Sequence, residues 1–310
     1  MVSPACHTFS LCAIPRPGNC SYETHERSSI KMVKGAPLTI GHIPYLNCVP
    51  FFHYLREAGC TGKLKSGVPS ALNSMLQQAE LDVSPSSSFE YARNWQDYLI
   101  IPNHSISSTG PVQSVLFFSP VSLECLSGKK IIITGDSATS INLLRIIMFE
   151  FIGVDQIADE VAHGDIEKML ASGMPTLLIG DRALKATQSA PRYMHCFDLG
   201  ELWHRHTGLP FVFALWMARK EAVSRHNEEI EKLGGQLSVA RKHFFSEIEA
   251  LANNVCQGSC LSQQGKIKYW KGIEYDLGAK HIEGMDLFFQ LCVKHGLLRN
   301  RPQINFVQSR

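Results

Sequence analysis

From residue 38 onward, short apolar runs alternate with segments of helical periodicity. The first series predicts strands and helices in turn at 38–43, 49–57, 63–67, 69–78, 81–84, 86–93 and 97–101. A second series follows at 130–134, 138–152, 158–162, 165–172, 175–180, 181–188 and 193–198. Strands that alternate with helices indicate βαβ units and mainly parallel sheets. We therefore expect an α/β fold with two mixed, mostly parallel sheets.

Two longer apolar strands stand outside these series, at 110–120 before the second series and at 209–220 after it. Each is long enough to cross from one lobe to another. A long helix at 221–252 then leads to a helical C-terminal region. The pattern predicts two lobes, with residues 36–112 and 216–310 in lobe 1 and residues 113–215 in lobe 2. Folds of this plan bind their ligand in the cleft between the lobes.

Residues 1–35 differ from the rest of the chain. They contain turn formers and scattered charges without periodicity, and they lack the basic start and apolar run of a secretory signal. We expect a disordered N-terminal tail, with Met32 as an alternative internal start.

Composition narrows the class of protein. An apolar fraction of 45% and a charged fraction of 19% are typical of a globular chain with a sizeable core. The net charge is +2 with no basic stripe, and no run approaches the roughly 18 apolar residues of a membrane span, so nucleic acid and membrane are poor candidate partners. Of the ten cysteines, only Cys256 and Cys260 form a close pair outside the tail, which is weak evidence for a metal. We expect a cytoplasmic protein with free thiols and with neither metal nor cofactor.

A polar turn follows the first predicted strand, in the stretch GHIPYLNCVPFF. Polar groups at the carboxyl end of a strand usually face a ligand, which makes Tyr45 and Asn47 candidates. The alternative is a plain turn in which Asn47 caps the helix at Pro50. We favour binding because capping does not require the neighbouring Tyr45.

Two further strand-to-helix turns, one in each lobe, are rich in hydroxyl groups. Hydroxyls and unpaired backbone N–H groups at a helix start make an anion site, although ordinary capping is the alternative for both turns. A dianionic ligand would bridge the two turns. The residues are Ser86, Ser87 and Ser88 in lobe 1 and Asp136, Ser137, Thr139 and Ser140 in lobe 2.

Two single polar residues have plainer interpretations. Ser114, in the apolar crossover strand, is typical of a satisfied core hydroxyl, and Asp181 is typical of a helix cap. The chain has no Walker loop, G-x-G-x-x-G, G-x-S-x-G or metal motif. The residues alone therefore indicate a two-lobed receptor for a small, dianionic organic acid.

Six segments, taken in order, resemble the chorismate dehydratases of the futalosine route to menaquinone. The resemblance covers about residues 38 to 300, and the ordered set is highly specific. The segments are IGHIPYLNCVPFF, GVPSALNSMLQQAELDVSPSSSFEYAR, SISSTGPVQSVLFFS, GDSATSINLLRI, TLLIGDRAL and GLPFVFALWMAR.

The resemblance implies a type II periplasmic-binding-protein fold used as a cytosolic hydro-lyase. Such an enzyme removes water from chorismate to give 3-[(1-carboxyvinyl)oxy]benzoate, the first step of that route. The two carboxylates of chorismate fit the two hydroxyl-rich turns. The family pattern assigns Asn47 and Ser114 to the reacting centre, and this raises Ser114 above its plainer interpretation. The segment SPSSSFEY is more serine-rich than the family pattern, which leaves open which serine touches the substrate.

The matched site holds amide and hydroxyl groups but no obvious general base. The enolpyruvyl carboxylate of the substrate is one candidate base, and His42, which faces either the cleft or away from it, is another. The competing function is a non-enzymatic cytosolic receptor for a small organic dianion. The chain shows no lipid-attachment cysteine and no DNA-binding segment, which disfavours transport and a fused regulator. The oligomeric state is open.

Overall fold

The computed structural model describes residues 36–135, 137–154 and 156–308. The chain divides into a unit Met1–Ala36 and a unit Pro37–Arg310, and the fold below is that of the second unit. The expected disordered tail at 1–35 lies outside the described residues, as does Asp136.

The first sheet has five strands in the order β2-β1-β3-β10-β4. Strand β1 pairs in parallel with β2 and β3, as the alternation of strands and helices predicts. Strand β10 joins this sheet from late in the chain and lies antiparallel between β3 and β4. The strands are β1 (Thr39–His42), β2 (Lys63–Ser66), β3 (Val83–Ser87), β4 (Tyr98–Ser108) and β10 (Phe211–Arg219).

The second sheet repeats this plan in the order β7-β6-β8-β5-β9. Strand β6 is parallel to β7 and β8, whereas β5 lies antiparallel between β8 and β9. Strands β5 and β8 are buried along their whole length, in keeping with their mainly apolar sequences. The strands are β5 (Val115–Ser119), β6 (Lys130–Ile133), β7 (Ala158–Val161), β8 (Thr176–Ile179) and β9 (His195–Asp198).

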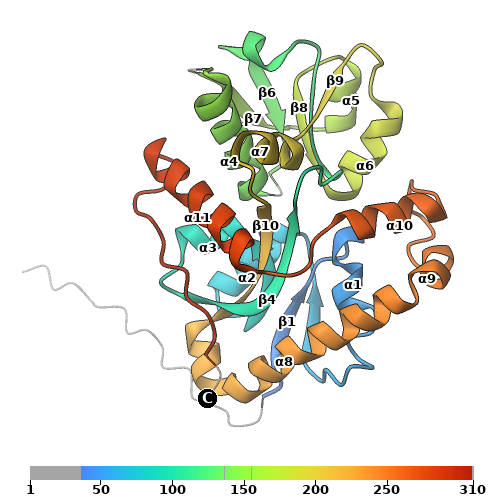
Figure 1. Cartoon of the computed structure of the whole chain (residues 1–310), viewed down its shortest axis with the longest axis vertical. Helices are drawn as coiled ribbons and strands as arrows, with labels where there is room; N and C mark the ends of the chain where they lie inside the picture. Colours follow the sequence, from blue (N-terminus) through green and yellow to red (C-terminus); the bar gives the residue numbers. More distant parts are fainter. Residues whose placement is uncertain (1–35, 136, 155, 309–310) are drawn as a thin grey trace, which may run out of the picture. The chain divides into compact units, whose positions relative to one another are not determined.

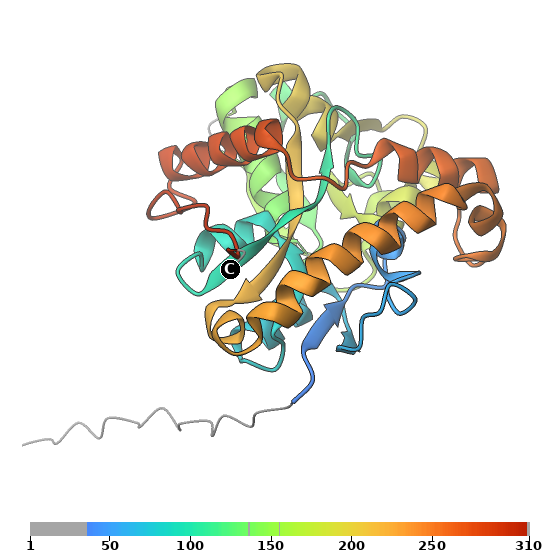
Figure 2. The same ribbon diagram turned by 60° about the horizontal axis from the view of Figure 1, so that its bottom comes forward.

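Helices flank both sheets, and two of those that follow β10 run beside the first sheet (Figures 1 and 2). Helix α8 packs on β4 and β10, while α11 packs on β10 and α3 and also contacts α4. The first lobe contains η1 (Leu46–Cys48), α1 (Val49–Phe52), α2 (Pro69–Gln77) and α3 (Ser88–Arg93). The second contains η2 (Leu123–Leu126), α4 (Ala138–Ile146), the π-helical η3 (Ile147–Ile152), α5 (Ile166–Ala171), α6 (Gly180–Ser189) and α7 (Leu199–Thr207). The C-terminal helices are α8 (Lys220–Ser246), α9 (Ile248–Asn254), α10 (Gln263–Gly272) and α11 (Ala279–Lys294).

The predicted α/β fold with two mixed sheets is confirmed. The expectation that the sheets are mostly parallel is wrong: the eight strand pairings of the described residues divide evenly into four parallel and four antiparallel, because β5 and β10 each pair antiparallel on both sides. The lobe boundaries at 112/113 and 215/216 stay a prediction, and β10, which contains residues 215 and 216, lies wholly in the first sheet.

Several elements differ from prediction, and two of them lie beside the candidate site. The helix expected at 49–57 is shorter, since α1 ends at Phe52 and i→i+3 hydrogen bonds such as Leu55 N to Phe52 O (3.3 Å) replace its continuation. The strand expected at 110–120 forms only from Val115. Before it, the carboxylate of Asp198 accepts the N–H groups of Val112 (3.1 Å) and Gln113 (2.6 Å), which fixes an irregular crossover.

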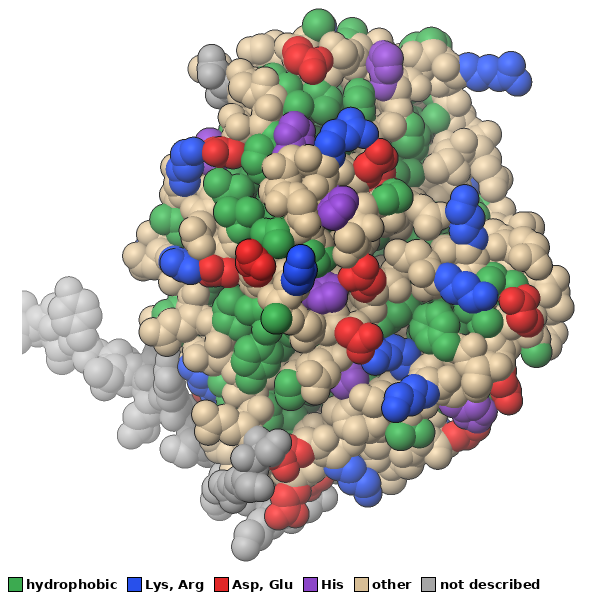
Figure 3. Space-filling view, in the orientation of Figure 1, with side chains coloured by type: hydrophobic (Ala, Val, Ile, Leu, Met, Phe, Trp, Pro, Cys, Tyr) green, Lys and Arg blue, Asp and Glu red, His purple; other side chains and the backbone are tan. Residues whose placement is uncertain are grey.

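Charged side chains of both signs are interspersed on the molecular face shown in Figure 3. No helix in the described ranges is long and apolar enough to cross a membrane.

Candidate functional site

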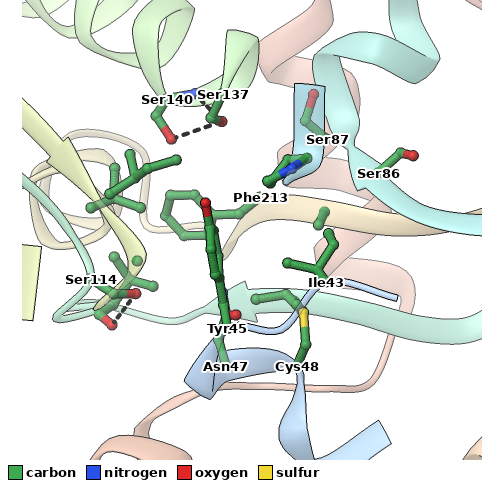
Figure 4. Close-up of a pocket in the computed structure, with 17 residues that line it drawn as sticks. Ile43, Tyr45, Asn47, Cys48, Ser86, Ser87, Ser114, Ser137, Ser140 and Phe213 are labelled. Atoms are coloured by element: carbon green, nitrogen blue, oxygen red, sulfur yellow. Dashed lines mark hydrogen bonds between the residues drawn. The ribbon is translucent and has the colours of Figure 1, made fainter. Parts of the chain in front are cut away.

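A pocket of about 600 Å³ of empty space, its open mouth included, lies where carboxyl ends of strands from both sheets meet (Figure 4). Strands β1 and β3 reach it from the first sheet, and the segments after β6 and β8 reach it from the second. Ligands of α/β proteins bind at such strand ends. The lining residues are Ile43, Tyr45, Asn47, Cys48, Pro69, Ser86, Ser87, Ile106, Val112, Ser114, Val115, Ser137, Ser140, Ile179, Gly180, Phe213 and Ala214.

The turn after β1 is fixed by contacts on both sides of Leu46. The indole N–H of Trp270 donates to Leu46 O (2.8 Å), and Leu46 N donates to Asp181 Oδ1 (3.2 Å). Asn47 does not cap the following helix, and its Oδ1 is fully buried with no hydrogen-bond partner among the described residues. The capping alternative for Asn47 is therefore wrong, and this residue lines the pocket with a side-chain oxygen that bonds no group of the described chain.

The Tyr45 ring stands in the middle of the pocket, with its hydroxyl directed toward Ser137 and Ser140 (Figure 4). Beside the ring lies Gly180, whose φ of +58° belongs to the left-handed region. A Cβ at this glycine would stand 3.2 Å from Tyr45 Cδ2. Tyr45 thus divides the pocket and is packed closely against the start of α6.

The three serines of the first lobe have three different environments. Ser87 caps α3 by accepting from Glu90 N (3.3 Å), as the capping alternative predicts for one serine. Ser88 lies off the pocket and donates to Val212 O (2.7 Å). Ser86 is buried, and within the described chain its Oγ has no hydrogen-bond partner. Figure 4 shows the side chains of Ser86 and Ser87 pointing in different directions, as expected for neighbours in a strand.

In the second lobe, Ser137 caps α4 by accepting from Ser140 N (3.3 Å), and Ser140 Oγ donates to Ser137 Oγ (3.1 Å). Both hydroxyls line the pocket at the positive end of the helix dipole. Thr139 does not line it, because Thr139 Oγ1 accepts the N–H of Phe89 (2.8 Å) from α3. The expected substrate contacts of Ser88 and Thr139 have no support in the geometry, since both hydroxyls hold α3 in place.

Ser114 is buried in the crossover between the sheets, and its Oγ donates a long hydrogen bond to Val112 O (3.5 Å). Its own carbonyl accepts the N–H of Gly180 (2.8 Å). Burial raises the pKa of the nearby Tyr269 phenol, while the Ser114 hydroxyl acts in the opposite direction. Ser114 therefore presents a weakly engaged hydroxyl to the pocket.

The pocket wall is electrically neutral over its described residues. Its polar side chains are the serine hydroxyls, the Asn47 amide, the Tyr45 phenol and the Cys48 thiol. The pKa of the Cys48 thiol is raised, mainly by burial and to a smaller extent by the negative charge of Asp181. His42 points elsewhere, because its Nδ1 bonds Ser66 Oγ (2.7 Å) and its ring packs on Phe52. No group of three His, Cys, Asp or Glu in the described part of the chain is arranged to hold a metal ion.

Of the ten candidate residues, seven line the pocket, Ser88 and Thr139 do not, and Asp136 lies outside the described residues. The sequence did not single out the apolar wall of Ile43, Ile179 and Phe213, although these residues lie within the family-like segments. The prediction that Asp181 caps a helix is wrong: α6 has no side-chain cap, and the carboxylate bonds the turn after β1 instead.

Most of this chain is similar in sequence to proteins of known families. A family model described as menaquinone biosynthesis matches residues 38–294. The chorismate dehydratase of Thermus thermophilus is 33% identical over 199 residues, which cover 60% of this chain and 71% of that protein. The chorismate dehydratase of Campylobacter jejuni is 29% identical over 184 residues, covering 57% of this chain and 66% of that protein.

Solved structures agree on the architecture. The alkanesulfonate-binding protein SsuA from Xanthomonas axonopodis pv. citri has a TM-score of 0.66 and 13% identity, covering 88% of this chain and 98% of that one. The periplasmic aliphatic sulphonate binding protein SsuA from Escherichia coli has a TM-score of 0.62 and 12% identity, covering 88% and 94%. At these identities the likeness shows the fold alone, which is the predicted periplasmic-binding-protein-like fold.

Proposed function

This chain belongs to the menaquinone biosynthesis family, and on that premise we propose that it is a chorismate dehydratase. It removes water from chorismate to give 3-[(1-carboxyvinyl)oxy]benzoate, acting as a cytoplasmic carbon–oxygen lyase. The observation that carries the proposal is the pocket itself, which brings together Asn47 and Ser114, the two residues assigned to the reacting centre. The Asn47 carbonyl is unpaired within the described chain, and the Ser114 hydroxyl is only weakly engaged.

The pocket offers an organic dianion hydroxyl donors and an apolar wall but no cationic side chain among its described lining residues. Hydroxyls of Ser137 and Ser140 at the start of α4 supply donors and a favourable helix dipole for one carboxylate. Ile43 and Phe213 give the ring an apolar surface. Hydroxyl and backbone donors in a partly enclosed, low-dielectric site are strong enough to hold carboxylates.

The reaction is an elimination that leaves an aromatic ring. The C–H bond at the ring carbon bearing the ether breaks, and its electron pair becomes the new ring double bond. The C–O bond at the neighbouring carbon breaks as hydroxide leaves and combines with the released proton as water. Because aromatisation supplies the driving force, the protein needs mainly to orient and polarise the substrate.

The proton acceptor is the enolpyruvyl carboxylate of the substrate. An amide and an unassisted serine hydroxyl are very poor bases near neutral pH, and no described lining residue is a carboxylate or an imidazole. The carboxylate is tethered within reach of the ring proton, and such placement compensates for its weak basicity. In this mechanism Asn47 holds the departing hydroxyl and Ser114 donates to the enolpyruvyl carboxylate.

The competing function is a receptor that binds a small organic dianion unchanged, and the solved sulfonate-binding proteins of similar fold make it the natural rival. A thermal-shift titration with chorismate, paired with an assay of the chorismate remaining, separates the two. The dehydratase consumes chorismate catalytically, at a rate proportional to protein. If the protein is a receptor, chorismate raises its melting temperature and all the chorismate remains intact. That result would overturn the proposal.

A further inference from the structure

The start of α6 contacts three parts of the candidate site at once. Gly180 N–H donates to Ser114 O (2.8 Å), the Gly180 backbone lies against the Tyr45 ring, and Asp181 accepts the N–H of Leu46 (3.2 Å). Leu46 separates Tyr45 from Asn47 in the chain. We propose that the Gly180–Asp181 pair is a positioning element that sets the Tyr45–Asn47 turn and Ser114 at the spacing the elimination requires. The proposal rests on the dehydratase function given above.

Asp181 acts through the backbone of the turn and not on the substrate. It lies at the second position of α6, next to the pocket-lining Gly180, and it is not itself a lining residue. Its Oδ1 is engaged by Leu46 N, while Trp270 holds the carbonyl of the same residue (2.8 Å). The peptide groups on both sides of Leu46 are thus fixed, one by Trp270 of α10 and the other by Asp181 of α6. Asn47 is the next residue, so these two contacts also fix the direction in which its side-chain amide leaves the backbone.

Gly180 completes the element because only glycine fits there. Its φ of +58° is strained for any residue with a side chain. A Cβ would also approach Tyr45 Cδ2 and Cε2 to 3.2 and 3.3 Å, so the ring would have to move within the pocket. The same residue binds the Ser114 carbonyl, which couples the position of the tyrosine to that of the serine.

The carboxylate has one competing role, that of the general base, and the Asn variant separates the two. Asp181→Asn keeps an oxygen that accepts from Leu46 N but cannot take a proton. We expect Asp181→Asn to retain turnover within a few-fold. Asp181→Ala should lower kcat by about 10- to 100-fold with a smaller change in KM, because a displaced Asn47 misorients the reacting groups. Asp165→Ala is the matched control: this acid caps α5 in the same lobe, away from the pocket, and its loss should leave kcat unchanged.

Hydrogen exchange of the peptide that contains Leu46, followed by mass spectrometry, tests the same contact without any turnover. Exchange should quicken in Asp181→Ala and match the parent protein in Asp181→Asn. The positioning role is overturned if Asp181→Ala keeps full kcat, if Asp181→Asn is as slow as Asp181→Ala, or if exchange at this peptide is the same in all variants. If the parent protein shows no dehydratase activity, the proposed function is wrong. The exchange measurement would still show whether Asp181 holds the N–H of Leu46.

Discussion

Replacing Asn47 by Ala is expected to separate stability from catalysis. The Asn47 Oδ1 is buried without a hydrogen-bond partner in the described chain. Leaving such a group unpaired costs about 1–3 kcal/mol, and its removal offsets the packing lost with the side chain. The free energy of unfolding of Asn47→Ala should therefore equal that of the parent protein or exceed it by about 1 kcal/mol, a rise in melting temperature of roughly 2–4 °C.

Turnover should change in the opposite direction. The Asn47 amide is proposed to hold the departing hydroxyl, and removal of one such preorganised group typically lowers kcat by about 10²–10³-fold. Calorimetry of the ligand-free protein gives the stability, and initial rates of chorismate loss give kcat and KM. A trade between the two is expected where a polar group is kept for function at the expense of stability.

Asn142 provides the matched control, because it is a buried asparagine whose side chain is fully used. Its Nδ2 donates to Ala138 O (2.9 Å), and its Oδ1 accepts from Arg145 Nη1 (3.0 Å). Asn142→Ala should lose about 1–3 kcal/mol of stability and keep its chemistry once folded. The reasoning fails if Asn47→Ala is destabilised as much as Asn142→Ala, or if it turns over chorismate at the parent rate.

Three further predictions concern the base, the second catalytic residue and an ion cluster. Ser114→Ala should lower kcat by at least about tenfold, since a hydrogen bond to a charged group contributes about 1.5–3 kcal/mol; an unchanged rate would make this serine a core hydroxyl. His42→Asn should keep measurable turnover, and abolished turnover in this variant would place the base on the protein. A chorismate analogue esterified at the enolpyruvyl carboxylate should bind without reacting, and reaction of the ester would likewise place the base on the protein. Hydrogen bonds from Lys294 Nζ (2.8 Å) and His295 Nε2 (2.7 Å) lower the pKa of Glu150 from its ordinary 4.5. This carboxylate therefore stabilises the fold above that pH, and the contribution disappears as the pH falls through the lowered value. Glu150→Gln should thus lower the melting temperature at pH 7 and match the parent protein in acid; an equal loss at both pH values would contradict this.

The alternation of apolar strands and helices was enough to predict the two sheets, but not the length of β4. The sequence predicts a strand only at 97–101, and Pro102 and Asn103, which follow it, are residue types typical of turns. In the structure the strand continues to Ser108 through a bulge: Ile100 pairs with Met217 and Ser105 with Leu215, so five steps in β4 match two in β10. Asn103, with a φ of +67°, accommodates the extra residues. Only pairing with a distant strand makes this segment extended.

The sequence predicted those features of the candidate site that depend on neighbouring residues in the chain. It did not predict the features that depend on contacts between residues far apart in the chain. Capping of α3 by Ser87 and of α4 by Ser137 follows from residue type and position. The contact of Asp181 with Leu46 joins residues 135 positions apart, and nothing in the local sequence distinguishes it from a cap. The unpaired state of Asn47 is likewise a consequence of tertiary burial.

Mass spectrometry of chorismate incubated with the purified protein of residues 1–310 tests the central proposal most directly. The account predicts a product lighter by one water that still carries the enolpyruvyl group, formed in proportion to protein and strongly reduced with Asn47→Ala. Unaltered chorismate in the presence of folded protein, or a product that has lost pyruvate and not water, would contradict it.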